Sequence, residues 1–166
     1  MPEALLVTRQ DVVKFTALNG NVDTDKFIQF VKIAQDTDLQ NYTGTKLLNK
    51  IKADIVANTL SGNYLTLTTT YLKPMLIHLA MKYYLPFAAY TISNKGVYKH
   101  NSENSTNVEK SEVDFLIEKE TQIAQHYTER FINYISFNNN LFPEYTANTN
   151  ADMFPDTNNN FTGWYI

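Results

Sequence analysis

The hydrophobic and polar positions of the chain repeat with helical spacing over five segments. In the second segment the apolar side chains Phe27, Phe30, Val31 and Ala34 recur at the i, i+3, i+4, i+7 spacing of one helical face. The pattern therefore predicts five helices, which cover about residues 8–18, 24–35, 45–60, 70–93 and 107–137.

Local signals mark where these helices begin and end. Thr8 is suited to cap the first helix, and Asp11 follows at the third helical position, as in an acidic form of the capping box. Polar breaks are expected at residues 36–44, where Gly44 closes the break, and at residues 61–63. Residues 97–100 are expected to form a short strand or an extended arm after a turn at residues 94–96.

The segment 70–93 is apolar on most sides, so it is expected to be the central, buried helix. Pro86 lacks a backbone donor and is expected to kink this helix near Lys82. The last helix has a one-sided stripe that should be buried. That stripe comprises Val113, Leu116, Ile117, Glu120, Ile123, Ala124, Tyr127, Phe131 and Tyr134.

The residues after 137 carry no lasting helical or strand period and are rich in asparagine and threonine. Six aromatic side chains interrupt this polar segment, and aromatic residues dominate binding hot spots. Two interpretations stay open: the segment packs back on its own domain, or it docks on a partner. Under the second, the docking residues are Phe142, Tyr145, Phe154, Phe161, Trp164 and Tyr165.

The predicted fold class is therefore all-α. It is a small bundle of about five helices, with a short extended arm or hairpin and a long irregular C-terminal tail. The domain boundaries are predicted at residues 1–137 for the helical domain and 138–166 for the tail.

Composition narrows the possible functions. The 166 residues suffice for one domain with a substantial core, and the absence of cysteine excludes disulfides and thiol chemistry. The net charge of −3 provides no global basic field for nucleic acid. No segment is apolar over the length of a membrane span.

Catalytic motifs are missing from the sequence. It contains no P-loop, no dinucleotide-binding glycine motif and no zinc-protease motif. His78 lies within the apolar segment, where a satisfied core histidine is the expected role, and Glu120 is expected to pair with a lysine or lie at a subunit boundary. We therefore expect no enzyme activity, no cofactor and no metal. A hydrolase with a diffuse site stays open as a less favoured alternative.

Three sequence pieces resemble a known family. They are Ala34-Gln35-Asp36 ahead of the junction at residues 39–44, Tyr71-x-Lys73-Pro74, and Asn94-Lys95-Gly96-Val97. Together with the helix order over residues 5–145, they resemble the head-to-tail connector proteins of tailed bacteriophages, and most closely the neck ring proteins of crAss-like phages.

The resemblance implies a structural virion protein of the neck, between the portal and the tail. Its copies would form a ring of about twelve subunits, a closed heterologous assembly. The implied partners are other copies of the chain, the portal protein, neighbouring neck or tail ring proteins, and double-stranded DNA that passes through without sequence recognition. The alternative is a cellular helical binding module that docks a protein partner through its tail.

A closed ring needs two different surface patches that meet. The acidic face of the 107–137 helix, with Glu112, Glu118 and Glu129, and the basic face with Lys46 and Lys50 are the candidate inter-subunit patches. The lysine face could instead be an ordinary solvated surface or a local phosphate contact.

Overall fold

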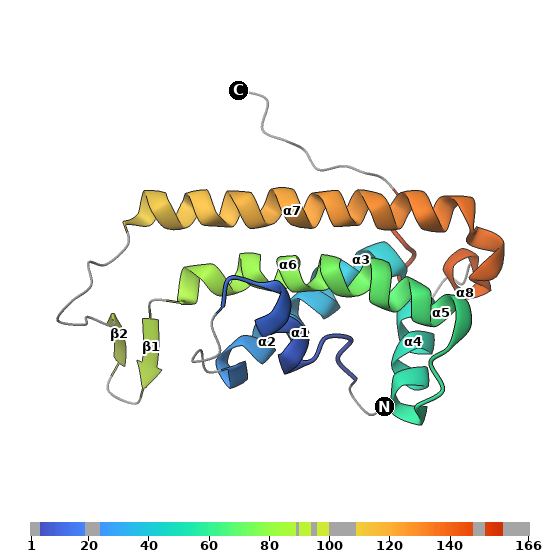
Figure 1. Cartoon of the computed structure of the whole chain (residues 1–166), viewed down its shortest axis with the longest axis horizontal. Coiled ribbons are helices and arrows are strands. Elements are labelled where there is room, and N and C mark those ends of the chain that lie inside the picture. The colour runs from blue at the N-terminus through green and yellow to red at the C-terminus, as the bar shows by residue number, and fades with distance from the viewer. Residues whose placement is uncertain are drawn as a thin grey trace, which may run out of the picture.

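The computed structural model describes residues 4–18, 24–88, 90–93, 96–99, 109–147 and 152–157. Its framework is a stack of three helices (Figure 1). The long helix α7 (Lys110–Phe137) lies along one side of α6 (Lys73–Tyr84) and runs antiparallel to it. Helix α2 (Thr24–Ala34) packs on the opposite side of α6. The predicted all-α bundle is confirmed.

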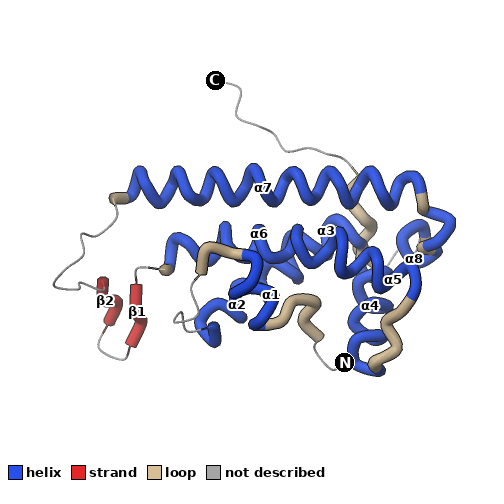
Figure 2. The backbone as a smooth tube through the Cα atoms, in the orientation of Figure 1, coloured by secondary structure: helices blue, strands red, loops and turns tan. Residues whose placement is uncertain are grey.

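Shorter elements complete the described fold. Two strands, β1 (Tyr90–Ser93) and β2 (Gly96–Lys99), pair as an antiparallel hairpin at one end of the molecule (Figure 2). The other helices are α1 (Arg9–Phe15), α3 (Gln40–Thr43), α4 (Thr45–Ala57), α5 (Gly62–Thr66) and α8 (Pro143–Thr146). π-helical segments cover Gln35–Leu39 and Leu67–Leu72, and 3-10 turns cover Leu85–Phe87 and Asn139–Leu141.

The predicted cap of the first helix is confirmed. The Thr8 side chain accepts a hydrogen bond from the Asp11 backbone N–H, and the Asp11 carboxylate accepts one from the Thr8 backbone N–H. Each bond satisfies a donor that a helix start leaves unpaired. The cap therefore fixes where α1 begins, and with it the position of the Asp11 carboxylate.

Helix α6 is the centre of the core, as its apolar sequence predicts. Six of its side chains are buried: Met75, Leu76, Ile77, Leu79, Ala80 and Met81. The helix ends at Tyr84, however, and does not continue to Ser93. Pro86 lies in the 3-10 turn that follows, because its ring and missing N–H oppose another α-helical turn. The predicted kink inside a longer helix is therefore wrong.

The predicted break at residues 36–44 is also wrong, because the chain stays helical up to Thr43. Every fourth residue of this run is buried: Phe27, Val31, Gln35, Leu39 and Thr43. In an α-helix each step of four residues turns the side chain by about 40°, so four steps would carry Thr43 to the far side. The wider π-helical turn absorbs this drift and keeps all five side chains on one face.

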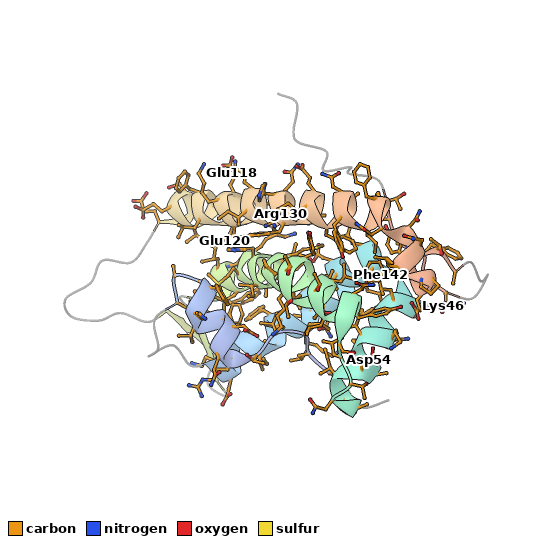
Figure 3. All side chains as sticks on the ribbon, turned by 45° about the vertical axis from the view of Figure 1, so that its right-hand side comes forward. Lys46, Asp54, Glu118, Glu120, Arg130 and Phe142 are labelled. Carbon is orange, nitrogen blue, oxygen red and sulfur yellow. The ribbon has the colours of Figure 1, made fainter. Side chains whose placement is uncertain are left out.

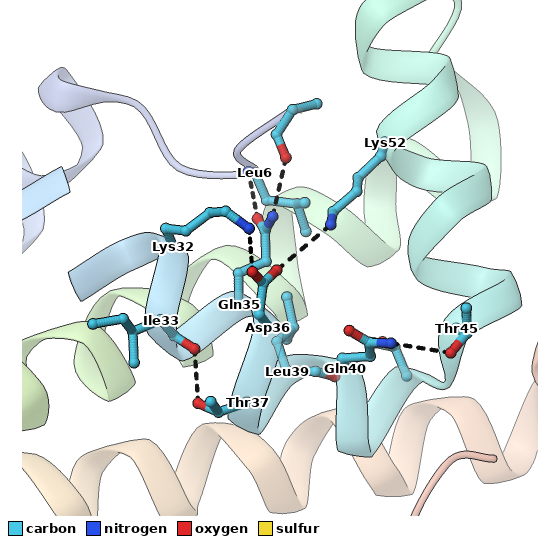
Figure 4. A network of polar contacts seen from close by, with 12 residues as sticks. Leu6, Lys32, Ile33, Gln35, Asp36, Thr37, Leu39, Gln40, Thr45 and Lys52 are labelled. Carbon is cyan, nitrogen blue, oxygen red and sulfur yellow. Dashed lines mark hydrogen bonds and ion pairs between the residues drawn. The ribbon is translucent and has the colours of Figure 1, made fainter. Parts of the chain in front are cut away.

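Gln35 within that turn holds the N-terminal arm. Its side chain is fully buried, accepts a hydrogen bond from the Leu6 N–H and donates one to the Ala4 carbonyl, both at 3.0 Å (Figure 4). The neighbouring Asp36 points outward and pairs with Lys32 and Lys52. The polar residues Gln35 and Asp36, at the start of the predicted break, thus have defined partners on the buried and the exposed side of one helix.

The predicted domain boundary at residue 137 is wrong as well. Pro143 begins the short helix α8, and the side chains of Phe142 and Tyr145 are buried in the core. Farther along, the Met153 carbonyl accepts a hydrogen bond from the Thr45 N–H at 3.1 Å, and the Asp156 N–H donates to the Asn41 carbonyl at 2.6 Å. Residues 138–147 therefore belong to the domain, and residues 152–157 lie across the junction of α3 and α4.

Gly44 at that junction gives a direct test of this packing. Its φ of +73° disfavours any side chain, and a Cβ atom there would lie 2.9 Å from the Pro155 Cδ. Gly44→Ala is expected to lower the free energy of unfolding by about 2–3 kcal/mol in urea titration. The strain of a side chain at positive φ and the overpacking against Pro155 both contribute to this loss.

Gly62→Ala is the matched control for this change. Gly62 has a similar φ of +56°, but a Cβ atom there meets nothing within 4 Å. Its cost should be about 1 kcal/mol, from the backbone alone. Equal costs for the two variants would show that residues 152–157 do not pack on Gly44 in solution.

Candidate functional site

A pocket of about 540 Å³ opens between α1, α6 and α7. Its apolar wall includes Phe15, Ile77 and Tyr127, and its polar wall includes Lys14 and Lys73. Phe15 comes from α1, whereas Ile77 and Tyr127 come from the two helices of the central stack. The pocket thus joins side chains that are far apart in the sequence.

An ion pair joins α1 to α6 at the edge of the pocket. The Lys73 Nζ lies 2.9 Å from the Asp11 Oδ2. Burial by itself would raise the pKa of Asp11, but the Thr8 N–H and the Lys73 ammonium outweigh it and hold that pKa below its ordinary value. The negative charge of the Asp11 carboxylate is therefore already compensated by the Lys73 ammonium of the same domain.

His78 and Glu120 form a second pair at the pocket. The His78 Nδ1 lies 2.7 Å from the Glu120 Oε2, and the imidazole ring stacks on Tyr127 with centroids 5.5 Å apart. His78 is thus a satisfied histidine, as expected, but the partner of Glu120 is this histidine and not a lysine. The two residues are 42 positions apart, and no local pattern in the sequence signals the contact.

Arg130 on α7 has an unusual environment. Its guanidinium carbon lies 5.7 Å from the ring centroids of both Tyr71 and Tyr127, and Tyr71 stacks on Tyr134 at 4.2 Å. Cation–π contacts orient a guanidinium without using its N–H donors. Within the described part of the chain, Arg130 has no carboxylate or hydrogen-bond partner, so this exposed cation is oriented and available beside the pocket.

The N-terminal half of α7 departs from the predicted buried stripe. Leu116 and Ile123 were expected inside, but they are 45% and 39% exposed, and Phe115 beside them is 55% exposed. A shallow hollow lined by Ser111, Glu112, Phe115 and Leu116 lies on this half. The C-terminal half does face the core, through Ala124, Phe131 and Ile135 among others.

A family of unknown function, DUF6712, matches residues 39–155, which is more than two thirds of the chain. The chain belongs to this family. The match includes α8 and ends at Pro155, so it covers residues 138–155 of the segment 138–166 that the sequence had assigned to a separate tail. Neither the curated proteins nor the solved structures contain a match.

Of the pocket walls, α6 and α7 lie inside the family match and α1 lies before it. The family description assigns no chemistry to either part. The function therefore has to be argued from the geometry of these side chains.

The six aromatic residues proposed for partner docking differ in their burial. Phe142 and Tyr145 are buried, with Phe142 packed edge-on against Tyr64 at 5.3 Å, so these two are core residues and cannot dock a partner (Figure 3). Phe154 is 44% exposed and keeps the predicted role as a proposal. The last three, Phe161, Trp164 and Tyr165, lie outside the described residues.

The proposed basic patch on α4 is largely satisfied internally. Lys50 pairs with Asp54 and lies 5.0 Å from the Tyr64 ring centroid. Lys46 is partly exposed on the same helix. Since Lys50 is already neutralised, α4 offers less free positive charge than the sequence indicates.

The acidic residues proposed on α7 differ in exposure. Glu112 and Glu118 are exposed, and Glu118 projects from the outer face of the helix (Figure 3). Glu129 is partly buried and accepts a hydrogen bond from Gln125 at 3.3 Å. The free negative charge is therefore concentrated near the start of α7, beside Phe115.

The described residues contain no cluster of three or more histidine or acidic side chains that could hold a metal ion. None of the helices in the described ranges has the length and apolar character needed to cross a membrane.

Proposed function

We propose that this chain is a structural virion protein, which forms a ring in the neck of a tailed bacteriophage between the portal and the tail. The observation that carries the proposal is the exposed apolar surface of α7, with Phe115, Leu116 and Ile123. Contiguous exposed apolar side chains mark interaction surfaces in soluble proteins. The resemblance of residues 5–145 to connector proteins supports the same assignment.

The pocket supports a binding role and not catalysis. Asp11 is paired with Lys73, and His78 is paired with Glu120, so these four titratable groups have partners within the fold. Thr69, which also lines the pocket, donates its hydroxyl to the Leu65 carbonyl at 2.8 Å. We therefore propose that the chain has no enzyme activity.

The proposed partners are other copies of the chain, the portal protein and adjacent neck or tail rings. Double-stranded DNA would pass through the ring without sequence recognition. The net charge of −3 supports this, because an acidic lining does not hold phosphates and lets DNA slide. The proposed location is the virion neck.

Sedimentation velocity and native mass spectrometry test this function. The purified chain, alone or with the portal protein, is expected to form a closed ring of about twelve copies. The ring should weaken as salt is raised, because exposed charge pairs are screened. A chain that stays monomeric under both conditions contradicts the proposal.

A second candidate function is a helical module that docks a partner through its C-terminal segment. The exposure of Phe154, next to residues that pack on α3 and α4, favours it. Such a module would bind its partner as a monomer, so the same sedimentation experiment separates the two candidates.

A further inference from the structure

We propose that the start of α7 in one copy docks into the pocket between α1, α6 and α7 of the next copy. We call the inserted surface the α7 ridge and define it as Phe115 and Leu116 with the flanking carboxylates Glu112 and Glu118. This inference rests on the proposed ring function and names the two patches through which its subunits would meet.

The first argument concerns the ridge. Glu112 and Glu118 lie three residues before and three residues after Phe115, so all three side chains share one helix surface. The ring of Phe115 is 55% exposed, and the Lys119 ammonium lies 5.3 Å from its centroid. Glu112 accepts a hydrogen bond from the Glu109 N–H and Glu118 accepts one from the Gln122 side chain, but neither carboxylate forms an ion pair with any side chain in the described ranges. An exposed aromatic anchor between two acidic groups is the typical composition of an interface hot spot with a polar rim.

The second argument concerns the pocket. Its volume of about 540 Å³ accommodates a phenyl ring and a leucine side chain, and Phe15, Ile77 and Tyr127 supply an apolar wall for them. Lys14 lies on its rim, where its ammonium is 5.3 Å from the Phe15 ring centroid and meets no carboxylate of the described chain. Arg130 on α7 lies next to the pocket, with its guanidinium carbon 5.7 Å from the ring centroid of the lining residue Tyr127.

Charge complementarity selects the occupant. Lys14 in the pocket and Arg130 next to Tyr127 lack carboxylate partners among the described residues, and the ridge presents two carboxylates beside the single ammonium of Lys119. The Tyr71 and Tyr127 rings, each with its centroid 5.7 Å from the guanidinium carbon, orient Arg130, which lowers the entropy lost when it binds a carboxylate. A second copy of this chain therefore fits the pocket in shape and in charge.

The geometry also suits a ring. Phe115 and Tyr127 are 12 positions apart on α7, which separates ridge and pocket by roughly 18 Å along the helix axis. The two patches are thus different surfaces of one subunit. Each copy can use both at once, as a heterologous contact that closes into a ring requires.

Cysteine cross-linking tests the contact directly, because the chain has no cysteine of its own. One preparation carries Ser111→Cys, beside the ridge, and a second, with a different tag, carries Gln10→Cys, at the pocket. Both side chains are exposed and neither is the proposed anchor or its apolar wall, so the fold and the contact should be unaffected. The mixture is expected to form a disulfide between the two tags under mild oxidation. As a matched control, Val56→Cys on α4, which is 51% exposed, should not cross-link to Ser111→Cys.

Charge reversal supplies a second readout. Arg130→Glu is expected to weaken assembly by at least about tenfold in sedimentation, because it places a carboxylate against the ridge of the neighbouring copy. Lys46→Glu makes the same charge change on α4, away from the pocket, and should leave assembly within about twofold of the unchanged chain.

The outcomes separate this inference from the proposed function. If the chain forms a ring but Ser111→Cys does not cross-link to Gln10→Cys, the interface is wrong and the ring function stands. The same conclusion follows if Lys46→Glu disrupts the ring and Arg130→Glu does not. If no ring and no cross-link form, alone or with the portal protein, both proposals fail.

Discussion

Replacing Phe142 with alanine is expected to lower the free energy of unfolding by about 3–5 kcal/mol. The ring is fully buried and packs against Tyr64 and Tyr134, with centroid distances of 5.3 and 6.2 Å. Its removal leaves a cavity between α5, the end of α7 and the start of α8, in addition to the lost transfer free energy. Urea titration followed by circular dichroism measures the change.

Phe154→Ala is the matched control for this prediction. Both residues belong to the C-terminal segment and both were expected to dock a partner, but Phe154 is 44% exposed. Its replacement should change stability by no more than about 0.5 kcal/mol. If Phe142→Ala costs less than about 1 kcal/mol, the segment after residue 137 is a separate tail after all.

Replacing Gln35 with leucine is expected to cost about 3–5 kcal/mol. The change removes both partners of the N-terminal arm, so the Leu6 N–H and the Ala4 carbonyl lose their hydrogen bonds. Leaving a buried backbone group unsatisfied costs about 1–3 kcal/mol, and two groups are affected here. The arm should also become sensitive to limited proteolysis, because Gln35 is what holds it against α2.

Two further variants sharpen this prediction. Gln35→Glu keeps the acceptor for the Leu6 N–H but places a carboxylate against the Ala4 carbonyl, so it should destabilise the fold and release the arm as well. Gln29→Leu changes an exposed glutamine on the same helix and should have an effect within about 0.5 kcal/mol. An arm that stays protected in Gln35→Leu would show that other contacts hold it.

Local chemistry made part of the fold predictable. The Thr8 cap, the buried α6 and the one-sided face of α2 each depend on residues within a few positions of one another. Helical periodicity and capping act over that range, so the sequence alone identifies them.

The errors come from contacts between distant residues. Leu116 lies on the predicted buried stripe of α7 yet is 45% exposed, and Phe142 lies in the predicted tail yet is buried, because only Phe142 meets the surface formed by α5 and α7. The His78–Glu120 pair and the placement of Arg130 between two tyrosines likewise depend on how α6 packs against α7. Periodicity on one helix carries no information about these partners.

The π-helical turn at Gln35–Leu39 has a consequence for how this chain can change in length. Loss of a single residue there would restore ordinary α-helical winding and place Leu39 eleven positions after Phe27, a net rotation of only about 20°. Substitution of the exposed Thr37 leaves that alignment intact. Point changes on the outer side of the turn and loss of one residue within it are therefore both expected to keep the buried row on one face, whereas loss of one residue earlier in α2 would rotate the residues after it by about 100°.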